Sequence, residues 1–290
     1  MKKTAVVTDS NSGISQQEAQ ELGLYVLPLP FTVGGQLFFE GMTLTQELFY
    51  QKLDEGCEVS TSQPSLGSIQ ELWDSILVEY DEIVHLPMSS GFSSSYASAM
   101  MLAQEYGGKV QVVDSLRISI TQRQAVLDAQ TLIQAGWEAV RIKEYLEGVK
   151  MYSSIYMMVD TMKYLKKSGR VSPTIAAIST ILNIKPILCI KGAKIDVVAK
   201  ARGIKQATDL LIKGIQGDLA GIFKDFAGPD KIWLKIAYSL NKAAAETLKT
   251  CAEAAFPGHH ISIEPLSFTV VCHAGPGTIA ITCCKKLSRL

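Results

Sequence analysis

The chain has 290 residues, of which 47% are hydrophobic and 19% are charged. This length and apolar content can form one large core or two ordinary ones, which excludes a disordered protein. Lysine and arginine together number 28, as do aspartate and glutamate, so the formal charge is zero. A net charge of zero argues against a protein whose main function is to bind nucleic acid or an anionic membrane.

The first half alternates between strand-like and helix-like patterns. We predict strands at Thr4–Thr8, Leu24–Leu27, Phe31–Val33, Gln36–Phe39, Glu82–Leu86 and Lys109–Val113. We predict helices at Ile14–Leu22, Gln46–Leu53, Ser65–Glu79, Ser94–Glu105, Ile118–Ala135 and Glu138–Gly148. Gly34-Gly35 is a strong hairpin signal between two of these strands. Repeated strand–loop–helix units favour a mostly parallel sheet with helices on both faces.

After about residue 150 the pattern changes. We predict strands at Ser153–Asp160, Ile184–Ile190, Ile195–Lys200, Lys231–Tyr238, Ile261–Ile263 and Thr278–Thr282, and helices at Ile175–Leu182, Ile204–Phe226 and Ala243–Ala255. A hairpin across Lys191–Lys194 is foreign to a purely parallel sheet. We therefore predict an α/β protein of two domains: an N-terminal, mostly parallel α/β/α sandwich (1–150) and a C-terminal α+β domain with a mixed, largely antiparallel sheet (151–290).

Several classes of site lack their motifs. The six cysteines form no C-x-x-C pair and have no repeated spacing with histidine, which makes zinc or a redox dithiol a poor interpretation. No phosphate-binding or dinucleotide-binding glycine motif is present. Apolar runs stop well short of the ~20 residues that a membrane span needs. The start of the chain is typical of a first strand rather than a signal peptide, so we expect a cytoplasmic protein.

Hydroxyl-rich loops follow the predicted strands. Thr8–Ser12 follows the first strand, Ser60–Ser65 precedes a helix, Ser89–Ser95 follows Glu82–Leu86, and Asp114-Ser115 follows Lys109–Val113. Ligands of parallel sheets lie beyond the carboxyl ends of the strands. Neutral hydroxyls and helix N-terminal amides without lysine or arginine suit a single carboxylate better than a phosphate. The competing interpretation is that these residues are ordinary helix N-caps and that Asp9 closes an Asx turn.

A catalytic alternative starts from Gly91-Phe92-Ser93-Ser94-Ser95. This segment resembles a nucleophile elbow but lacks its final glycine. The best base would be His273, in the glycine- and proline-rich segment Val271–Thr278, because His85 lies in a predicted apolar strand and His259-His260 look like surface residues. Serine acyl hydrolase with Ser93 and His273 is therefore the alternative function, and a sugar- or phosphate-binding module is the third.

Two short basic segments stand out in the second half. Lys166–Arg170 and Lys200–Gly203 each place an arginine beside a glycine. They are either charges at element ends or a small cationic patch for an anionic partner.

The ordered motifs of the whole chain resemble the DegV family. They are Thr8-Asp9-Ser10, Thr61-Ser62-Gln63-Pro64-Ser65, Ser89-Ser90-Gly91-x-Ser93, Tyr164-Leu165-x-x-x-Gly169-Arg170, Leu182–Leu188, Arg202-Gly203 and His273-x-Gly275-Pro276-Gly277. The chain departs from the family pattern at Asn11, Ser94-Ser95 and Ser168.

The resemblance implies a non-catalytic, lipid-binding bacterial protein of phospholipid metabolism. Such a protein binds one long-chain fatty acid in a buried apolar tunnel of domain 1–150, without cofactor or metal. Domain 151–290 closes the site and faces an ATP-dependent fatty acid kinase catalytic subunit, which phosphorylates the presented carboxylate to acyl-phosphate. Contact with a membrane would be transient.

The same resemblance assigns roles to particular residues. Thr61 and Ser93 would hold the carboxylate, with Ser62, Gly91 and Phe92 assisting. Arg170, Arg202 and His273 would serve the kinase partner and phosphotransfer.

Overall fold

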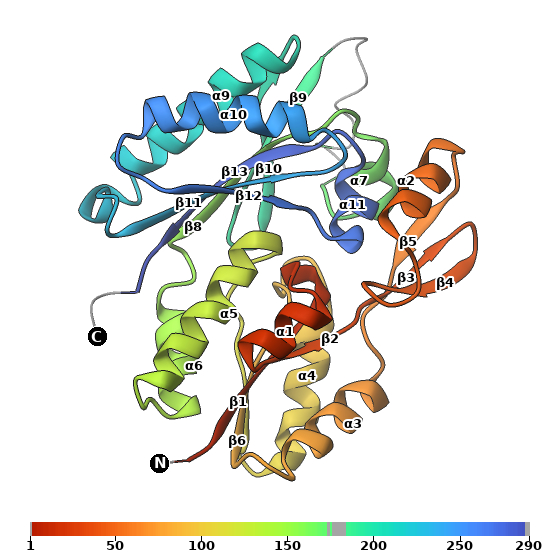
Figure 1. The fold of residues 1–290 in the computed structure, drawn as a ribbon, viewed down its shortest axis with the longest axis vertical. Helices are drawn as coiled ribbons and strands as arrows, with labels where there is room; N and C mark the ends of the chain where they lie inside the picture. Colours follow the sequence, from red (N-terminus) through yellow and green to blue (C-terminus); the bar gives the residue numbers. More distant parts are fainter. Residues whose placement is uncertain (1, 173–174, 176–183, 288–290) are drawn as a thin grey trace. The chain divides into compact units, whose positions relative to one another are not determined.

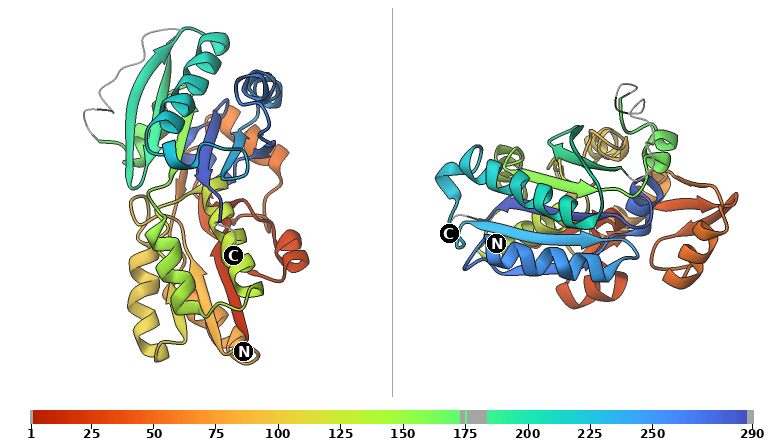
Figure 2. Two further views of the ribbon diagram at one scale, coloured as in Figure 1. Left: turned by 90° about the vertical axis from the view of Figure 1, so that its left-hand side faces the viewer. Right: turned by 90° about the horizontal axis from the view of Figure 1, so that it is seen from above.

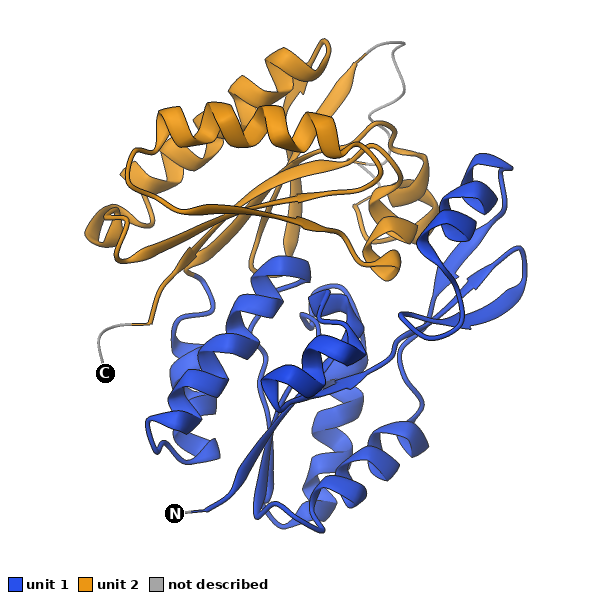
Figure 3. Cartoon of the chain, in the orientation of Figure 1, with its two compact units in different colours: residues 1–151 blue, residues 152–290 orange. Residues whose placement is uncertain are grey.

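A computed structural model of the protein describes residues 2–172, 175 and 184–287. The chain forms two compact units, residues 1–151 and 152–290 (Figures 1 and 3). The predicted helix Ile175–Leu182 lies, except for its first residue, outside the described residues.

Unit 1 is built on a four-stranded parallel sheet. Its strand order is β2-β1-β6-β7, with β1 at Thr4–Asp9, β2 at Tyr25–Leu27, β6 at Glu82–Leu86 and β7 at Val110–Val112. Every residue of β1 and of β6 is buried, as expected of central strands covered on both faces. The predicted parallel α/β/α sandwich is confirmed.

Helices cover both faces of this sheet. On one face, α3 (Leu66–Ile76) and α4 (Ser95–Ala103) pack with Ala5 and Val7 around the fully buried Trp73. On the other face, α5 (Ser119–Gln134) lies against β1 and β6, beside α6 (Ala139–Gly148). The alternation of side chains along β1 separates the two layers. The short helix α1 (Gln16–Leu22) connects β1 to β2.

A small antiparallel sheet, ordered β4-β3-β5, extends unit 1. It contains β3 (Pro30–Val33), β4 (Gln36–Phe39) and β5 (Val59–Thr61), and α2 (Gln46–Asp54) follows β4 in the chain. Gly34 and Gly35 have φ of 58° and 81°, the left-handed values that the predicted hairpin turn needs. Strand β5 was not predicted, because three residues with one apolar side chain carry little pattern. It forms by pairing with β3.

Unit 2 contains a six-stranded mixed sheet, ordered β10-β9-β8-β13-β11-β12. The strands are β8 (Ser153–Met158), β9 (Lys185–Lys191), β10 (Lys194–Ala201), β11 (Ile232–Tyr238), β12 (Ile261–Pro265) and β13 (Ile279–Lys285). Only the β11–β12 pair is parallel among these neighbours, which confirms the largely antiparallel sheet. Helices α9 (Ile204–Ala220) and α10 (Lys242–Ala255) run beside each other over one face (Figure 2).

The structure of unit 2 differs from the predicted elements at three helices. The helix predicted to reach Phe226 ends at Ala220, and Gly221 breaks it. Helix α7 (Lys163–Ser168) was not predicted. Helix α11 (Phe268–Ala274) was not predicted either, and His273, which we assigned to a glycine- and proline-rich segment, lies in the last turn of this helix. Its β-branched residues have low helix propensity, so the sequence pattern did not indicate a helix here. The helix packs against α7.

Candidate functional site

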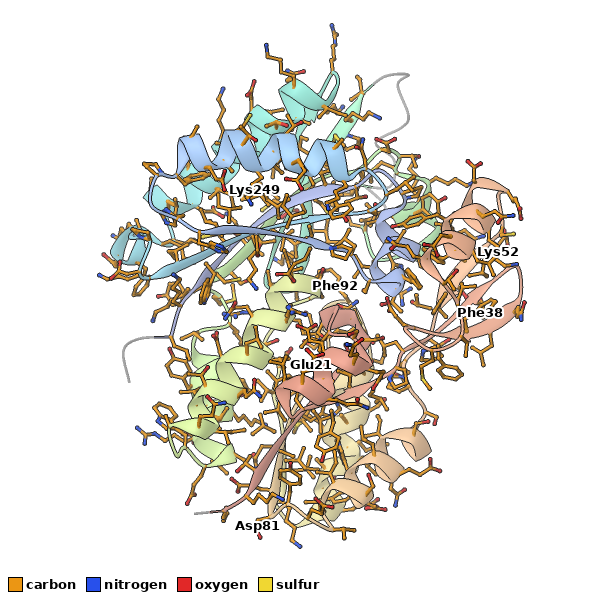
Figure 4. The ribbon with its side chains drawn as sticks, in the orientation of Figure 1. Glu21, Phe38, Lys52, Asp81, Phe92 and Lys249 are labelled. Carbon is orange, nitrogen blue, oxygen red and sulfur yellow. The ribbon has the colours of Figure 1, made fainter. Side chains whose placement is uncertain are left out.

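Polar loops gather at the carboxyl edge of the parallel sheet of unit 1. The loops after β1, β6 and β7 all leave this edge, because the three strands are parallel. In Figure 4 the labelled Phe92, which follows β6, lies at the end of unit 1 opposite Asp81, which precedes β6. The predicted convergence of strand-exit loops is therefore present.

The turn between β6 and α4 is held by Ser89. The Ser89 carbonyl accepts from the amides of Phe92 (3.1 Å) and Ser93 (3.2 Å), and the Ser89 hydroxyl accepts from the Gly91 amide (3.2 Å). The amides of Gly91 and Phe92 thus already donate inside the turn, and a bound anion would have to share them. Their first effect is to fix the shape of the turn.

The hydroxyl of Ser93 lies at the N-terminus of α4. It accepts a hydrogen bond from the Ser95 amide (3.1 Å) and is 2.8 Å from the Ser95 hydroxyl. Ser94, formally the N-cap residue, makes no side-chain capping bond. Ser93 therefore caps the helix, and its half-buried hydroxyl stands where the helix dipole favours a negative charge.

The loop that follows Thr61 is hydrogen-bonded to the same helix, α4. It is the half-buried last residue of β5, opposite Phe31 of β3, and the exposed Ser62 donates its amide to the Pro30 carbonyl (3.0 Å). The Gln63 amide group then makes two hydrogen bonds with the Ser98 hydroxyl of α4 (3.1 and 3.3 Å). The two predicted hydroxyl-bearing loops are thus both fastened to α4.

Some of the hydroxyls in these loops are helix caps, as the competing interpretation holds. The Ser65 hydroxyl accepts from the Ser68 amide (3.0 Å) and caps α3. This accounts for one residue of the Thr61–Ser65 motif without any ligand.

The buried carboxylate of Asp9 connects several segments at this edge of the sheet. Its carboxylate accepts hydrogen bonds from the amides of Met88 (2.8 Å) and Asn11 (3.1 Å) and from the Gln122 side chain (2.9 Å). The bond to Asn11 is the Asx turn that we considered for this residue. Burial raises the pKa of Asp9 to about 6, and the three hydrogen bonds oppose that shift. Asp9 is therefore a buried anchor that joins β1, β6 and α5.

Asp114 joins the last two loops of this edge. It accepts from the Ser90 hydroxyl (2.6 Å) and amide (3.3 Å), which ties the loop after β7 to the turn after β6. The edge is thus preorganised by short-range bonds between loops.

In unit 2, Arg170 and His273 lie near each other. Burial, and then the positive charge of Arg170, lowers the pKa of His273 to about 4, so this imidazole is neutral at pH 7. Helices α7 and α11 approach closely because residue 275 is glycine: a Cβ there would lie 2.5 Å from the Tyr164 ring. The predicted Tyr164 and Gly275 motifs thus meet in space.

Arg202 is exposed and directly follows β10. Its amide donates to the Gln206 side chain (2.6 Å). The preceding Ala201 pairs with Lys185, whose ammonium lies 2.7 Å from Asp160, beside Gly277. Arg202 therefore stands at the same end of the unit 2 sheet as the glycine-rich segment after His273.

Of the other histidines, His85 and His259 are packing residues, whereas His260 is exposed as expected. His85 is 2% exposed, meets Trp73 edge-on at 5.4 Å, and has its pKa lowered to about 3 by burial, as its place in an apolar strand predicts. His259 was expected at the surface, but both of its ring nitrogens are buried, and the ring packs on Phe256. Within residues 2–172, 175 and 184–287, no acidic, cysteine or histidine cluster could hold a metal ion. No helix in that part of the chain is long and apolar enough to cross a membrane.

Comparisons with known proteins agree with this architecture. Residues 3–286 match the family described as an uncharacterised protein of the DegV family. A DegV domain-containing protein of Deinococcus radiodurans is 29% identical over 281 residues, 96% of each chain.

Two solved structures share the fold. A fatty-acid-binding DegV family protein from Thermus thermophilus superposes with a TM-score of 0.87 at 27% identity, covering 98% of this chain and all of the other. A DegV fatty acid binding protein from Bacillus subtilis has a TM-score of 0.84 at 24% identity, with 99% and 100% coverage. The order of motifs, the two-unit architecture and the family match together show that this chain belongs to the DegV family.

Proposed function

We propose that this protein binds one long-chain fatty acid and holds its carboxylate with the hydroxyls of Thr61 and Ser93. The observation that carries this proposal is that both hydroxyl-bearing loops are fastened to α4, near whose N-terminus Ser93 stands. Ser62 and the amides of Gly91 and Phe92 complete the proposed head-group site. The fatty-acid-binding relative from Thermus thermophilus supports the assignment of the ligand.

The physical chemistry of the site suits a carboxylate. Neutral donors and a helix N-terminus compensate a single negative charge without a fixed countercharge. Burial of ~14 methylenes at ~0.8 kcal/mol each contributes ~11 kcal/mol before the cost of ordering the ligand. The chain thus supplies most of the affinity, and the carboxylate sets the position of the ligand.

The proposed function includes presentation of the carboxylate to a separate ATP-dependent kinase subunit, which makes acyl-phosphate. Arg202 is exposed and suits contact with an anionic group of that partner. The neutral His273, with Arg170 beside it, is suited to a hydrogen-bonding role rather than to a charged one. In this scheme the present chain binds and orients, and the partner carries out the phosphoryl transfer.

The alternative hydrolase would need Ser93 activated by a base. In unit 1 the Ser93 hydroxyl is bonded to Ser95 and serves as a helix cap. This arrangement favours binding over nucleophilic attack. Hydrolysis of a nitrophenyl ester by the purified protein would favour the hydrolase instead.

The test of the proposed function is the identity of the bound molecule. The protein is purified from bacteria and denatured. The lipids that it releases are then identified and quantified by mass spectrometry. We expect about one equivalent of fatty acid per chain, and delipidated protein should take up one equivalent again. Recovery of no fatty acid, together with no binding in the titration, would refute the proposal.

A further inference from the structure

Arg117 is a buried cation without a partner in unit 1. It is 2% exposed, and none of its three guanidinium nitrogens has a hydrogen-bond partner in the described part of the chain. Guanidinium does not lose its proton in proteins, so this residue cannot escape the cost of burial by becoming neutral. A buried, unpaired charge is strongly unfavourable and calls for a counter-ion.

The segment that contains Arg117 is hydrogen-bonded to the turn that carries Ser93. The Arg117 carbonyl accepts from the Ser89 amide (2.9 Å), and the Ser89 carbonyl accepts from the Ser93 amide (3.2 Å). Asp114 also accepts from the Ser90 hydroxyl (2.6 Å). The loop after β7 therefore runs beside the turn after β6, and Arg117 contacts the residue that holds Ser93 in place.

The nearby acid Asp114 does not pair with Arg117. Its carboxylate accepts from Ser90 and from the Leu116 amide (3.3 Å) instead. The hydroxyl of Ser115 is likewise buried and has no partner among the described residues. Buried polar atoms are nearly always hydrogen-bonded, so two such exceptions on one short segment indicate a ligand group that satisfies them. Both exceptions can donate to an anion.

The backbone on both sides of Arg117 is held in a costly conformation. Leu116 and Ser119 have φ of 51° and 52°, left-handed values that are unfavourable for such residues. The Ser119 amide donates to the Asn11 side chain (2.9 Å) in the loop after β1. Hydrogen bonds to two other strand-exit loops thus fix the position of Arg117 at the carboxyl edge of the sheet.

We propose that Arg117 supplies the positive charge of the fatty-acid head-group site and makes this site selective for ionised acids over neutral lipids of the same chain length. This inference rests on the proposed function, which places the carboxylate at Thr61 and Ser93. Those donors are neutral and can hold a single charge by themselves, but a fatty alcohol satisfies them equally well. A guanidinium adds charge-assisted hydrogen bonds that only the ionised acid can accept.

The first experiment compares hexadecanoic acid with hexadecan-1-ol on delipidated protein. Binding is measured by calorimetry for the unchanged chain and for Arg117→Met, whose side chain is unbranched and uncharged. We expect the dissociation constant for the acid to rise about 30-fold or more, while that for the alcohol changes less than about threefold. The control Arg141→Met removes an exposed arginine of the same unit and should change neither.

A second measurement reports the charge itself. Hexadecanoic acid labelled with carbon-13 at the carboxyl group is titrated in the bound state by NMR. The carboxyl pKa should be about 1–3 pH units higher in Arg117→Met than in the unchanged chain, because a neighbouring positive charge favours the carboxylate. Arg117→Lys keeps the charge, so its bound acid should retain the low pKa.

A third measurement separates ligand binding from folding. Removal of an unpaired buried charge should raise the free energy of unfolding of the delipidated protein, measured by urea denaturation. A delipidated Arg117→Met protein that is less stable than the unchanged chain would show that Arg117 is stabilised within the protein, and this would overturn the proposal.

The remaining outcomes separate the two proposals. Equal weakening of acid and alcohol by Arg117→Met would mean that Arg117 shapes the pocket without supplying its charge, and an unchanged carboxyl pKa would exclude it from the head-group site. If the unchanged chain bound no fatty acid at all, the proposed function itself would fail.

Discussion

At the scale of single residues, the polar side chains of the candidate site in unit 1 are of two kinds. Asp9 is fully committed to internal hydrogen bonds, and its role is to join strands and helix. Thr61 and Ser93 are only half-buried, the first at the end of β5 and the second in the turn before α4. Removal of either kind should therefore affect different properties, stability for Asp9 and binding for the hydroxyls.

Thr61→Ala should weaken fatty-acid binding by about 1.5–3 kcal/mol, the usual contribution of a hydrogen bond to a charged group. Binding is measured by titration of delipidated protein with hexadecanoic acid. The matched control is Ser60→Ala, since Ser60 precedes Thr61 on the same strand and its exposed hydroxyl bonds to Thr32. Unchanged affinity in Thr61→Ala would remove Thr61 from the head-group site.

The stability contributed by Asp9 should depend on pH. Burial raises its pKa in the folded chain to about 6 from the ordinary value of 3.8, so the folded chain holds this proton more tightly than the unfolded chain. The resulting stabilisation is fully present below about pH 4 and is lost as the pH rises through 6, about 3 kcal/mol in all.

The Asp9→Asn variant serves as the reference, because the asparagine side chain does not titrate and its contribution to stability does not change with pH. The free energy of unfolding, measured by urea denaturation at pH 4, 5, 6 and 7, should fall with rising pH in the unchanged chain relative to this variant. A constant difference between the two proteins across that range would show that the Asp9 carboxyl is not shifted.

At the scale of elements, close approach of backbone segments shapes unit 2. Helices α7 and α11 bring the neighbourhoods of Arg170 and His273 together, and Gly275 makes room for the Tyr164 ring. Gly275 also has φ of 81°, a left-handed value. One residue thus meets two constraints, one conformational and one steric.

Gly275→Ala should destabilise the protein by about 2–4 kcal/mol, because it adds backbone strain and a contact with Tyr164 that is too short. Gly169→Ala is the control, since Gly169 has φ of 68° but nothing within 4 Å of its added Cβ, and it should cost only ~1–2 kcal/mol. Urea denaturation measures both.

The steric part of the effect should disappear when the ring is removed. Tyr164→Ala combined with Gly275→Ala should then cost less than the sum of the single changes. If Gly275→Ala cost no more than Gly169→Ala, the contact with Tyr164 would not limit the packing of the two helices.

At the scale of the whole molecule, the chain divides into two units with separate cores. One core surrounds Trp73 beneath α3 and α4, and the other lies between the six-stranded sheet and helices α9 and α10. The proposed carboxylate donors belong to unit 1, and the proposed partner residues belong to unit 2. Binding and transfer should therefore respond to different substitutions.

Arg202→Ala should leave fatty-acid affinity unchanged within about twofold but lower the rate of acyl-phosphate formation about tenfold or more when the kinase subunit and ATP are added, in line with ~1.5–3 kcal/mol for a hydrogen bond to a charged group. The control is Lys200→Ala, which removes a nearby charge from β10. Equal losses in binding and in phosphorylation would contradict this separation of roles.

The amino-acid sequence alone was enough to predict the parallel sheet of unit 1, the mixed sheet of unit 2 and the Gly34-Gly35 hairpin. These features depend on local periodicity and on residues that tolerate left-handed backbone, and such signals can be read within a few positions. The gathering of hydroxyl-rich loops at one edge of the sheet was also predictable, because the carboxyl ends of parallel strands lie at the same edge.

Only the tertiary structure decided the features that join distant segments. Strand β5 exists because β3 offers it a pairing edge, and α11 forms against α7 in spite of its β-branched residues. The burial of Asp9 was likewise not predictable, since whether a carboxyl group is buried depends on which loops the fold brings around it. Local pattern sets the elements, whereas contacts between residues far apart in the chain set the site.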